Sequence, residues 1–88
     1  MKEEAKKAVK QYIRGELLRT RCMLGLSREE MSFRMGISEW GYKDLERGKF
    51  CCSLIPMLLF VNHCCLDPDA FFNGLKEAAK VDDWKRVL

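Results

Sequence analysis

The residue types that most often bind metals or attack substrates occur in two short stretches of the chain. Adjacent cysteines occupy residues 51–52, and the sequence HCC occupies residues 63–65. Cysteine and histidine are the usual zinc ligands, but neighbouring cysteines cannot easily direct both sulfurs at one ion, and Cys-x-x-Cys spacing is absent. Five cysteines in a chain that shows no secretory leader do not predict a disulfide framework either. We therefore favour ordinary part-buried thiols over a zinc site and expect no cofactor.

Catalytic chemistry finds little support in the sequence. The single histidine, His63, lies beside Cys64, and no paired carboxylates, Cys–His arrangement or Gly-rich phosphate loop accompanies it. We interpret His63 as a part-buried residue at the end of a helix rather than as a general base. The sequence therefore predicts that the protein is not an enzyme.

The charged residues are distributed unevenly along the chain. The net charge of the 88 residues is +3, and residues 1–50 hold twelve Lys and Arg against eight Asp and Glu. A basic excess suits a polyanionic partner such as nucleic acid, although a solvated charged surface also explains it. No apolar run is long enough to span a bilayer, and the first residues lack a signal-peptide pattern. We expect a cytoplasmic protein with no membrane contact.

Helical periodicity runs along the chain, and no segment shows the alternation of a strand. Apolar residues recur at helical spacing over about residues 2–24, which predicts one long helix that Gly25 ends. Ser27 and Glu30 form a capping-box pattern for a second helix, which Gly36 closes. The apolar stripe of the long helix consists of Val9, Ile13, Leu17, Leu18 and Leu24.

Three further helices are predicted by their capping residues. Ser38 is placed to cap a third helix that ends near Arg47, and Ser53 is placed to cap a fourth. Asp67 followed by Pro68 is a favourable start for a fifth. The fourth segment, LIPMLLFVNHCC, is apolar almost all the way round, so we expect more than one of its faces to be buried.

The fifth helix and the C-terminus continue the apolar pattern. Phe71, Phe72 and Leu75 are expected to face inward. Val81, Trp84 and Leu88 keep a spacing of three to four residues, which predicts a helical arm with an apolar stripe. A single small domain of this length buries a modest core, so we expect it to gain further burial from a partner chain.

The order of these elements resembles a known family. From about Ile13 to Phe72 the sequence resembles the Cro/repressor-type helix-turn-helix family, also called XRE-like or lambda-repressor-like DNA-binding domains. The matching segments are RCMLGLSREEMSFRMGIS, LERGK, a serine with apolar residues after it, and LDPDAFF. In this match Ser32 is the small residue where two helices approach, and Gly36 lies at the turn. The buried positions of the motif are Met31, Met35, Ile37, Tyr42 and Leu45.

The resemblance implies a fold and a division of the chain. The fold is all-α: a five-helix lambda-repressor-like bundle with a helix-turn-helix, an extended N-terminal helix and a C-terminal helical arm. Residues 1–12 form the N-terminal helical extension, residues 13–75 the helix-turn-helix DNA-binding domain and residues 76–88 the arm.

The resemblance also implies roles for individual residues. A recognition helix at about residues 38–47 is expected to enter the major groove of double-stranded DNA. The base-facing positions are Glu39, Trp40, Lys43 and Asp44. The phosphate-contacting positions are Arg28, Lys49 and Ser38. Arg21 and Glu46 match a pair that links the first helix to the end of the recognition helix, and we expect this pair to add little stability where it is exposed.

The acidic residues of the recognition helix depart from the family, whose members commonly carry Gln, Ser, Thr or Arg there. A carboxylate can accept a hydrogen bond from cytosine N4, so acidity does not exclude base reading. Between Ser38 and Arg47, however, three acidic residues outweigh two basic ones, which weakens the attraction to phosphates. Helix electrostatics explains Glu39 equally well, because it lies at a helix N-terminus and precedes Lys43 by four residues.

Aromatic residues form a second departure. Phe33, Trp40 and Phe50 stand where the family is usually polar, and with the apolar fourth segment they indicate a protein interface, most commonly that of a symmetric homodimer. The leading hypothesis is a sequence-specific DNA-binding transcriptional regulator that acts as a homodimer. The alternative is a protein-interaction module that keeps the fold, binds a protein partner and has weakened or lost DNA binding.

Overall fold

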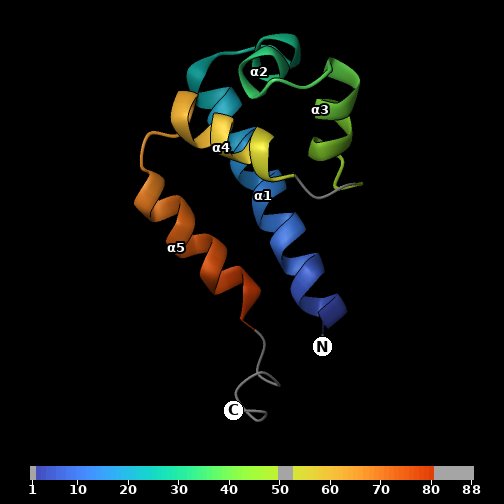
Figure 1. Cartoon of the computed structure of the whole chain (residues 1–88), viewed down its shortest axis with the longest axis vertical. Helices are drawn as coiled ribbons and strands as arrows, with labels where there is room; N and C mark the ends of the chain where they lie inside the picture. The colour runs from blue at the N-terminus through green and yellow to red at the C-terminus, as the bar shows by residue number, and fades with distance from the viewer. Residues whose placement is uncertain (1, 50–52, 81–88) are drawn as a thin grey trace.

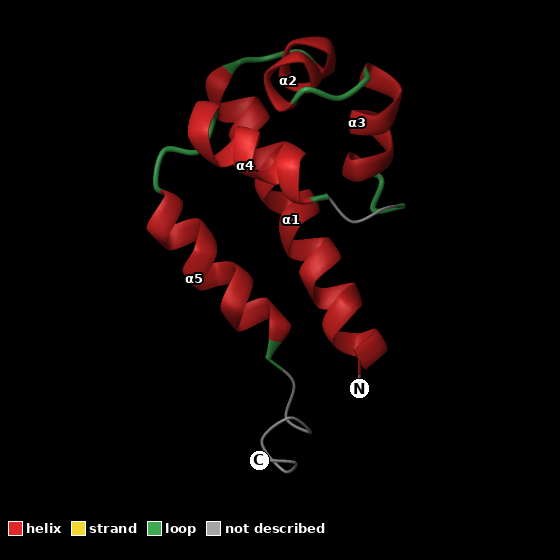
Figure 2. Ribbon diagram, in the orientation of Figure 1, coloured by secondary structure: helices red, strands yellow, loops and turns green. Residues whose placement is uncertain are grey.

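The computed structural model describes residues 2–49 and 53–80, which form five α-helices and no strand (Figures 1 and 2). The helices are α1 (Lys2–Leu24), α2 (Arg28–Met35), α3 (Glu39–Glu46), α4 (Leu54–His63) and α5 (Pro68–Ala79). The all-α class and the five helices predicted from the sequence are confirmed.

Local capping interactions set the ends of α2 and α3. The Glu30 amide donates to Ser27 Oγ over 3.1 Å, and the Ser27 amide donates to Glu30 Oε1 over 3.0 Å, which completes the predicted capping box. Gly36 closes α2 with a φ of +70°, a left-handed conformation that favours glycine. Ser38 Oγ then accepts the amide of Gly41 over 3.0 Å and begins α3. Local interactions therefore fix the turn at both of its ends, at the last residue of α2 and at the first turn of α3.

The two later helices begin differently from one another. Asp67 Oδ1 accepts the Ala70 amide over 3.1 Å, as predicted for the cap of α5. Ser53 occupies the cap position of α4, but its side chain makes no capping hydrogen bond there. The predicted role of Ser53 is therefore correct in position and wrong in the interaction.

The helices pack in a chain of contacts that begins with the long helix α1. It packs against α5 along one side and against α3 near its C-terminal half, while α2 packs between α3 and α4 (Figure 1). The core lies where these helices meet, and Met31, Met35 and Tyr42 are completely buried in it. The remaining buried apolar residues are Ile13, Leu17, Leu45, Phe60, Cys64 and Phe71.

Several apolar residues expected in the core lie at the surface. Leu18 is 40% exposed and Phe72 is 37% exposed, because the stripes of α1 and α5 that bury Leu17 and Phe71 leave these neighbours to one side. His63, expected to be part-buried, is exposed at the end of α4.

The helix α4 buries one face instead of the several that its sequence predicts. Phe60 is fully buried, whereas Leu54 and Ile55 are each 70% exposed. Its main neighbour among the described residues is α2, which covers a single side. The other residues expected to cover or continue apolar surfaces, Phe50, Val81, Trp84 and Leu88, lie outside the described residues, as do Cys51 and Cys52. Among the helices described, none combines the length and apolar character that crossing a membrane requires.

A close approach of α1 and α5 depends on one glycine. The Tyr12 hydroxyl donates to the Phe71 carbonyl over 2.9 Å, and the centroids of the two rings lie 5.7 Å apart. A Cβ atom at Gly74 would lie 2.2 Å from the Tyr12 hydroxyl oxygen and 2.6 Å from its Cζ, closer than atoms can approach. The packing of the tyrosine therefore requires glycine at this position of α5.

Gly74→Ala is expected to lower the free energy of unfolding by about 2 kcal/mol, because the added methyl group displaces Tyr12 from α5. Gly15→Ala provides the matched control, since Gly15 lies inside α1 with nothing within 4 Å of an added Cβ. The control should raise stability by about 0.5–1 kcal/mol through helix propensity. Urea denaturation of both variants checks the prediction, and equal stabilisation by the two substitutions would contradict it.

Candidate nucleic-acid interface

The two sides of α3 differ in exposure. Tyr42, Leu45 and Glu46 are buried on the inner side. Since successive helical residues turn by about 100°, the outer side carries the residues three and four positions apart from Trp40. Trp40 itself is 69% exposed, and the other residues of this outer side are Lys43 and Asp44, with Arg47 one turn later at the C-terminal cap.

The base-facing positions expected from the sequence lie on or beside this outer side. Glu39 and Trp40 are exposed in the first turn, and Lys43 and Asp44 are half-buried one turn later. The Lys43 ammonium lies 5.1 Å from the centre of the Trp40 ring, a cation–π contact. Among the described residues no ion pair joins Glu39 to Lys43, so the helical pair expected from their spacing is not formed.

A buried carboxylate fixes the inner side of α3. Glu46 is only 7% exposed, and its Oε2 accepts hydrogen bonds from Arg21 Nε over 2.7 Å and from the Tyr42 hydroxyl over 2.6 Å. Its Oε1 accepts a hydrogen bond from Arg28 Nε over 3.1 Å. We call Arg21, Arg28, Tyr42 and Glu46 the Glu46 cluster; it joins α1, α2 and α3. The structure thus brings Arg21 and Glu46 together as expected, with Glu46 buried and Arg21 part-buried, so the condition of an exposed pair does not hold.

The cluster stays charged at neutral pH. Burial by itself raises the pKa of Glu46, but hydrogen bonds from Arg21, Tyr42 and Arg28 outweigh it and hold that pKa below its ordinary value. The hydrogen bond to Glu46 also raises the pKa of Arg21. Burial and the adjacent carboxylate raise the pKa of the Tyr42 hydroxyl, so it remains a neutral donor. Two guanidinium groups therefore share one carboxylate.

This arrangement corrects the charge balance expected for the recognition helix. The sequence count of three acidic residues against two basic ones includes Glu46, which is buried and paired. Without Glu46, this segment has two acidic residues, Glu39 and Asp44, and two basic residues, Lys43 and Arg47. The surface of α3 is consequently less negative than a count of its charged residues suggests.

Basic side chains from three helices line a pocket of about 240 Å³ next to the cluster. We call this the basic pocket; its lining residues are Arg14, Leu18, Arg28, Lys43, Glu46 and Arg47. Arg14 was not anticipated from the sequence as a site residue, and its Nε donates to the main-chain carbonyl of Glu46. The spacing of seven residues between Arg14 and Arg21, which puts both on one face of α1, was the available signal.

The three expected phosphate-contacting residues are not gathered at one place. Arg28 is half-exposed at the basic pocket, with its Nε held by Glu46. Ser38 lies at the start of α3, where its oxygen is already used as a cap. Lys49 is exposed. It follows Gly48, whose left-handed conformation, with a φ of +75°, turns the chain away from α3. Ser38 and Lys49 therefore bracket α3 at its two ends.

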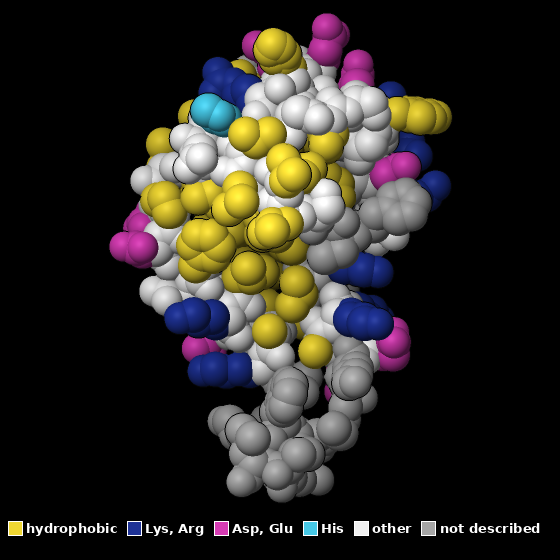
Figure 3. Space-filling view, viewed as in Figure 1, with side chains coloured by type: hydrophobic (Ala, Val, Ile, Leu, Met, Phe, Trp, Pro, Cys, Tyr) yellow, Lys and Arg dark blue, Asp and Glu magenta, His cyan; other side chains and the backbone are white. Residues whose placement is uncertain are grey.

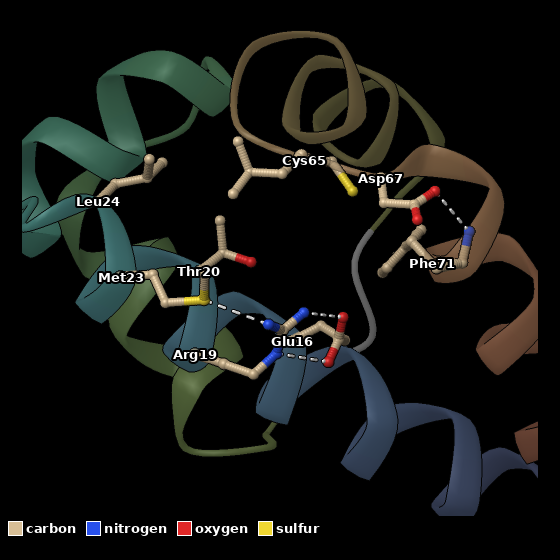
Figure 4. A pocket seen from close by; sticks show the side chains of 10 residues that line it. Glu16, Arg19, Thr20, Met23, Leu24, Cys65, Asp67 and Phe71 are labelled. Carbon is tan, nitrogen blue, oxygen red and sulfur yellow. Dashed lines mark hydrogen bonds and ion pairs between the residues drawn. The ribbon is translucent and has the colours of Figure 1, made fainter.

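A second cavity of about 250 Å³ lies between α1 and the start of α5, and its charged groups already have partners (Figure 4). Arg19 donates to both carboxylate oxygens of Glu16, over 2.9 and 3.1 Å, while Asp67 caps α5. Within the described ranges, no buried side-chain nitrogen or oxygen lacks a hydrogen bond, and no three His, Cys, Asp or Glu side chains lie together as a metal site. The carboxylates and the guanidinium group that line this cavity are therefore already paired.

The chain matches no protein-family model, no curated protein and no solved structure. Its function is therefore inferred from its residues and their geometry.

Glu46→Gln is expected to lower the free energy of unfolding at pH 7 by about 3 kcal/mol, because it leaves the part-buried Arg21 and the half-exposed Arg28 without their carboxylate. The folded-state pKa of Glu46 lies below its ordinary value of 4.5, so its stabilising effect is full above pH 4.5 and is lost as pH falls through the folded-state value. The difference between the two proteins should therefore shrink in acid.

Urea denaturation between pH 7 and pH 3 measures this dependence. Asp44→Asn is the matched control, since it removes a half-buried carboxylate from the same helix without touching the Glu46 cluster. A constant difference between the parent protein and Glu46→Gln across this pH range would show that the carboxylate is not held ionised by the arginines.

Proposed function

We propose that this chain is a sequence-specific DNA-binding transcriptional regulator, with α2 and α3 acting as a helix-turn-helix on a lambda-repressor-like bundle. The observation that carries the proposal is the contrast between the two sides of α3. The inner side is anchored to α1 and α2 through Glu46, whereas the outer side is exposed and bordered by basic residues of three helices. Such a rigid, exposed helix is what insertion into a groove requires.

The dimensions and side chains of α3 suit the major groove. An α-helix with its side chains is roughly 10–12 Å in diameter, which fits the major groove of roughly 12 Å width. Carboxylates at Glu39 and Asp44 can accept hydrogen bonds from cytosine N4, and the exposed face of Trp40 can contact a thymine methyl group. Because this surface carries equal numbers of acidic and basic side chains, the attraction to DNA phosphates must come from basic residues on either side of the helix.

Binding to a randomised duplex library at low and near-physiological salt, followed by sequencing of the retained DNA, tests the proposal. The expected result is an enriched motif with steep salt dependence. Glu39→Gln should change the preferred bases, whereas Lys49→Ala should weaken binding to all sequences and reduce the salt slope by about 1.

Lys7→Ala is the control for Lys49→Ala, because Lys7 is an exposed lysine on α1 away from α3. Absence of retained DNA even at low salt would overturn the proposal. That outcome would favour the protein-interaction module, for which the 76% exposure of Phe33 and 69% exposure of Trp40 would supply the contact residues.

The proposed regulator acts as a homodimer that pairs through α4. Figure 3 shows apolar side chains gathered over α4 and the adjoining part of α5. We call the exposed members of this surface the α4 face: Leu54, Ile55, Leu58 and Phe72. No charged residue occurs in Leu54–Val61, so the surface that best covers the α4 face is itself apolar, and a second copy provides one.

The size of the α4 face agrees with a dimer of modest affinity. At roughly 100 Å² for each exposed side chain, it supplies roughly 400 Å² of apolar surface per copy. Since a little over half of a typical interface is apolar, this corresponds to about 700 Å² per copy, close to the roughly 800 Å² that each partner buries in a standard interface. Two bound half-sites on DNA would add to this affinity.

Ile55→Glu is expected to abolish self-association, because it places a charge on the α4 face at a residue that is 70% exposed and outside the core. Phe33→Glu is the matched control, since Phe33 is similarly exposed, at 76%, on α2 but lies outside the α4 face. Sedimentation over a range of protein concentrations, with circular dichroism to verify folding, separates the two variants. Loss of the dimer in the control alone would assign the interface to α2 instead.

A further inference from the structure

The basic pocket has a charge that its neighbours do not neutralise. It combines four basic side chains, Arg14, Arg28, Lys43 and Arg47, with the single carboxylate of Glu46. That carboxylate is also shared with Arg21, which donates hydrogen bonds to both of its oxygens. The pocket is therefore strongly positive, and Lys43 and Arg47 have no ion pair among the described residues.

Two of its guanidinium groups are fixed in orientation but keep free donors. Arg14 donates through Nε to the Glu46 carbonyl, and Arg28 donates through Nε to the Glu46 carboxylate. No described residue accepts a hydrogen bond from the terminal Nη groups of either side chain. Anchoring at Nε lowers the entropy that each side chain loses when its Nη groups bind a ligand.

We propose that the basic pocket binds one phosphate group. A guanidinium fork matches the oxygens of a phosphate in paired hydrogen bonds, and the pocket offers the forks of Arg14 on α1, Arg28 on α2 and Arg47 directly after α3. The Lys43 ammonium adds a point charge beside them. The side chain of Leu18, 40% exposed at the pocket, supplies an apolar surface for the carbon atoms attached to a phosphodiester.

This inference gives Lys43 a different role from base contact. Its ammonium lines the pocket and lies over Trp40, so it links the phosphate position to the exposed face of α3. Assigning the phosphate to a DNA backbone rests on the proposed function, whereas the affinity of the pocket for phosphate does not. A backbone phosphate held between α1 and α3 would fix the angle at which α3 approaches the bases.

Two phosphate probes test the pocket without DNA. Dimethyl phosphate and inorganic phosphate are titrated at constant ionic strength while the Nε–H resonances of Arg14 and Arg28 are followed in ¹⁵N-labelled protein. We expect saturable shifts at both side chains. The double variant Lys43→Gln, Arg47→Gln should weaken this binding by about fivefold or more, because it removes two positive charges from the pocket. Neither residue belongs to the Glu46 cluster, so the cluster stays intact in this variant.

The matched control is Lys7→Gln, Lys76→Gln, which removes two exposed charges on α1 and α5 outside the pocket. The control should retain phosphate affinity within about twofold. Shifts that do not saturate, or equal weakening in the control, would overturn the proposal, because they would indicate general charge attraction rather than a bound phosphate.

Binding of the same variants to duplex DNA identifies the source of the phosphate. A salt slope that is shallower by about 1 in the pocket variant than in the control assigns the phosphate to the DNA backbone. Loss of phosphate binding with an unchanged slope assigns the pocket to a free phosphate ligand. If the protein binds phosphate but no duplex, the pocket stands and the proposed function fails; if it binds duplex with an unchanged slope and neither probe, only the pocket inference fails.

Discussion

The buried carboxylate of Glu46 is the interaction on which the arrangement of the first three helices depends. It accepts hydrogen bonds from Arg21 on α1, Arg28 on α2 and Tyr42 on its own helix. Burying a charge is costly unless it is paired and fully hydrogen-bonded, and here each carboxylate oxygen has at least one donor. Because the geometry of these donors is specific, the cluster fixes the position of α3 more narrowly than apolar packing would.

The same cluster determines the electrostatics of the exposed surface. Neutralising Glu46 inside the protein removes one of the three acidic groups that α3 would otherwise present to a polyanion. It also holds Arg28, while the main-chain carbonyl of Glu46 holds Arg14, and both side chains keep free donors at the basic pocket. One residue at the end of α3 thus affects both the packing of the helices and the charge of the exposed surface.

The small size of the core explains the other main feature of the surface. The tight contact of α1 with α5 at Tyr12 and Gly74 uses the apolar stripe of α5, and α2 covers one side of α4. The described helices leave Leu54 and Ile55 exposed to solvent. A domain of this size cannot bury every apolar side chain that its helices carry, so an association surface is a natural consequence of its composition.

The sequence by itself determined the helices and their ends. Ser27 with Glu30, Ser38, Gly36 and Asp67 act on backbone groups within three or four residues, so local sequence is enough to place them. Only the tertiary structure decided that Glu46 is buried, that Arg14 joins the basic pocket and that α4 exposes an apolar face. These features depend on contacts between residues far apart in the chain, such as the 32 positions between Arg14 and Glu46, and helical periodicity does not specify which faces meet.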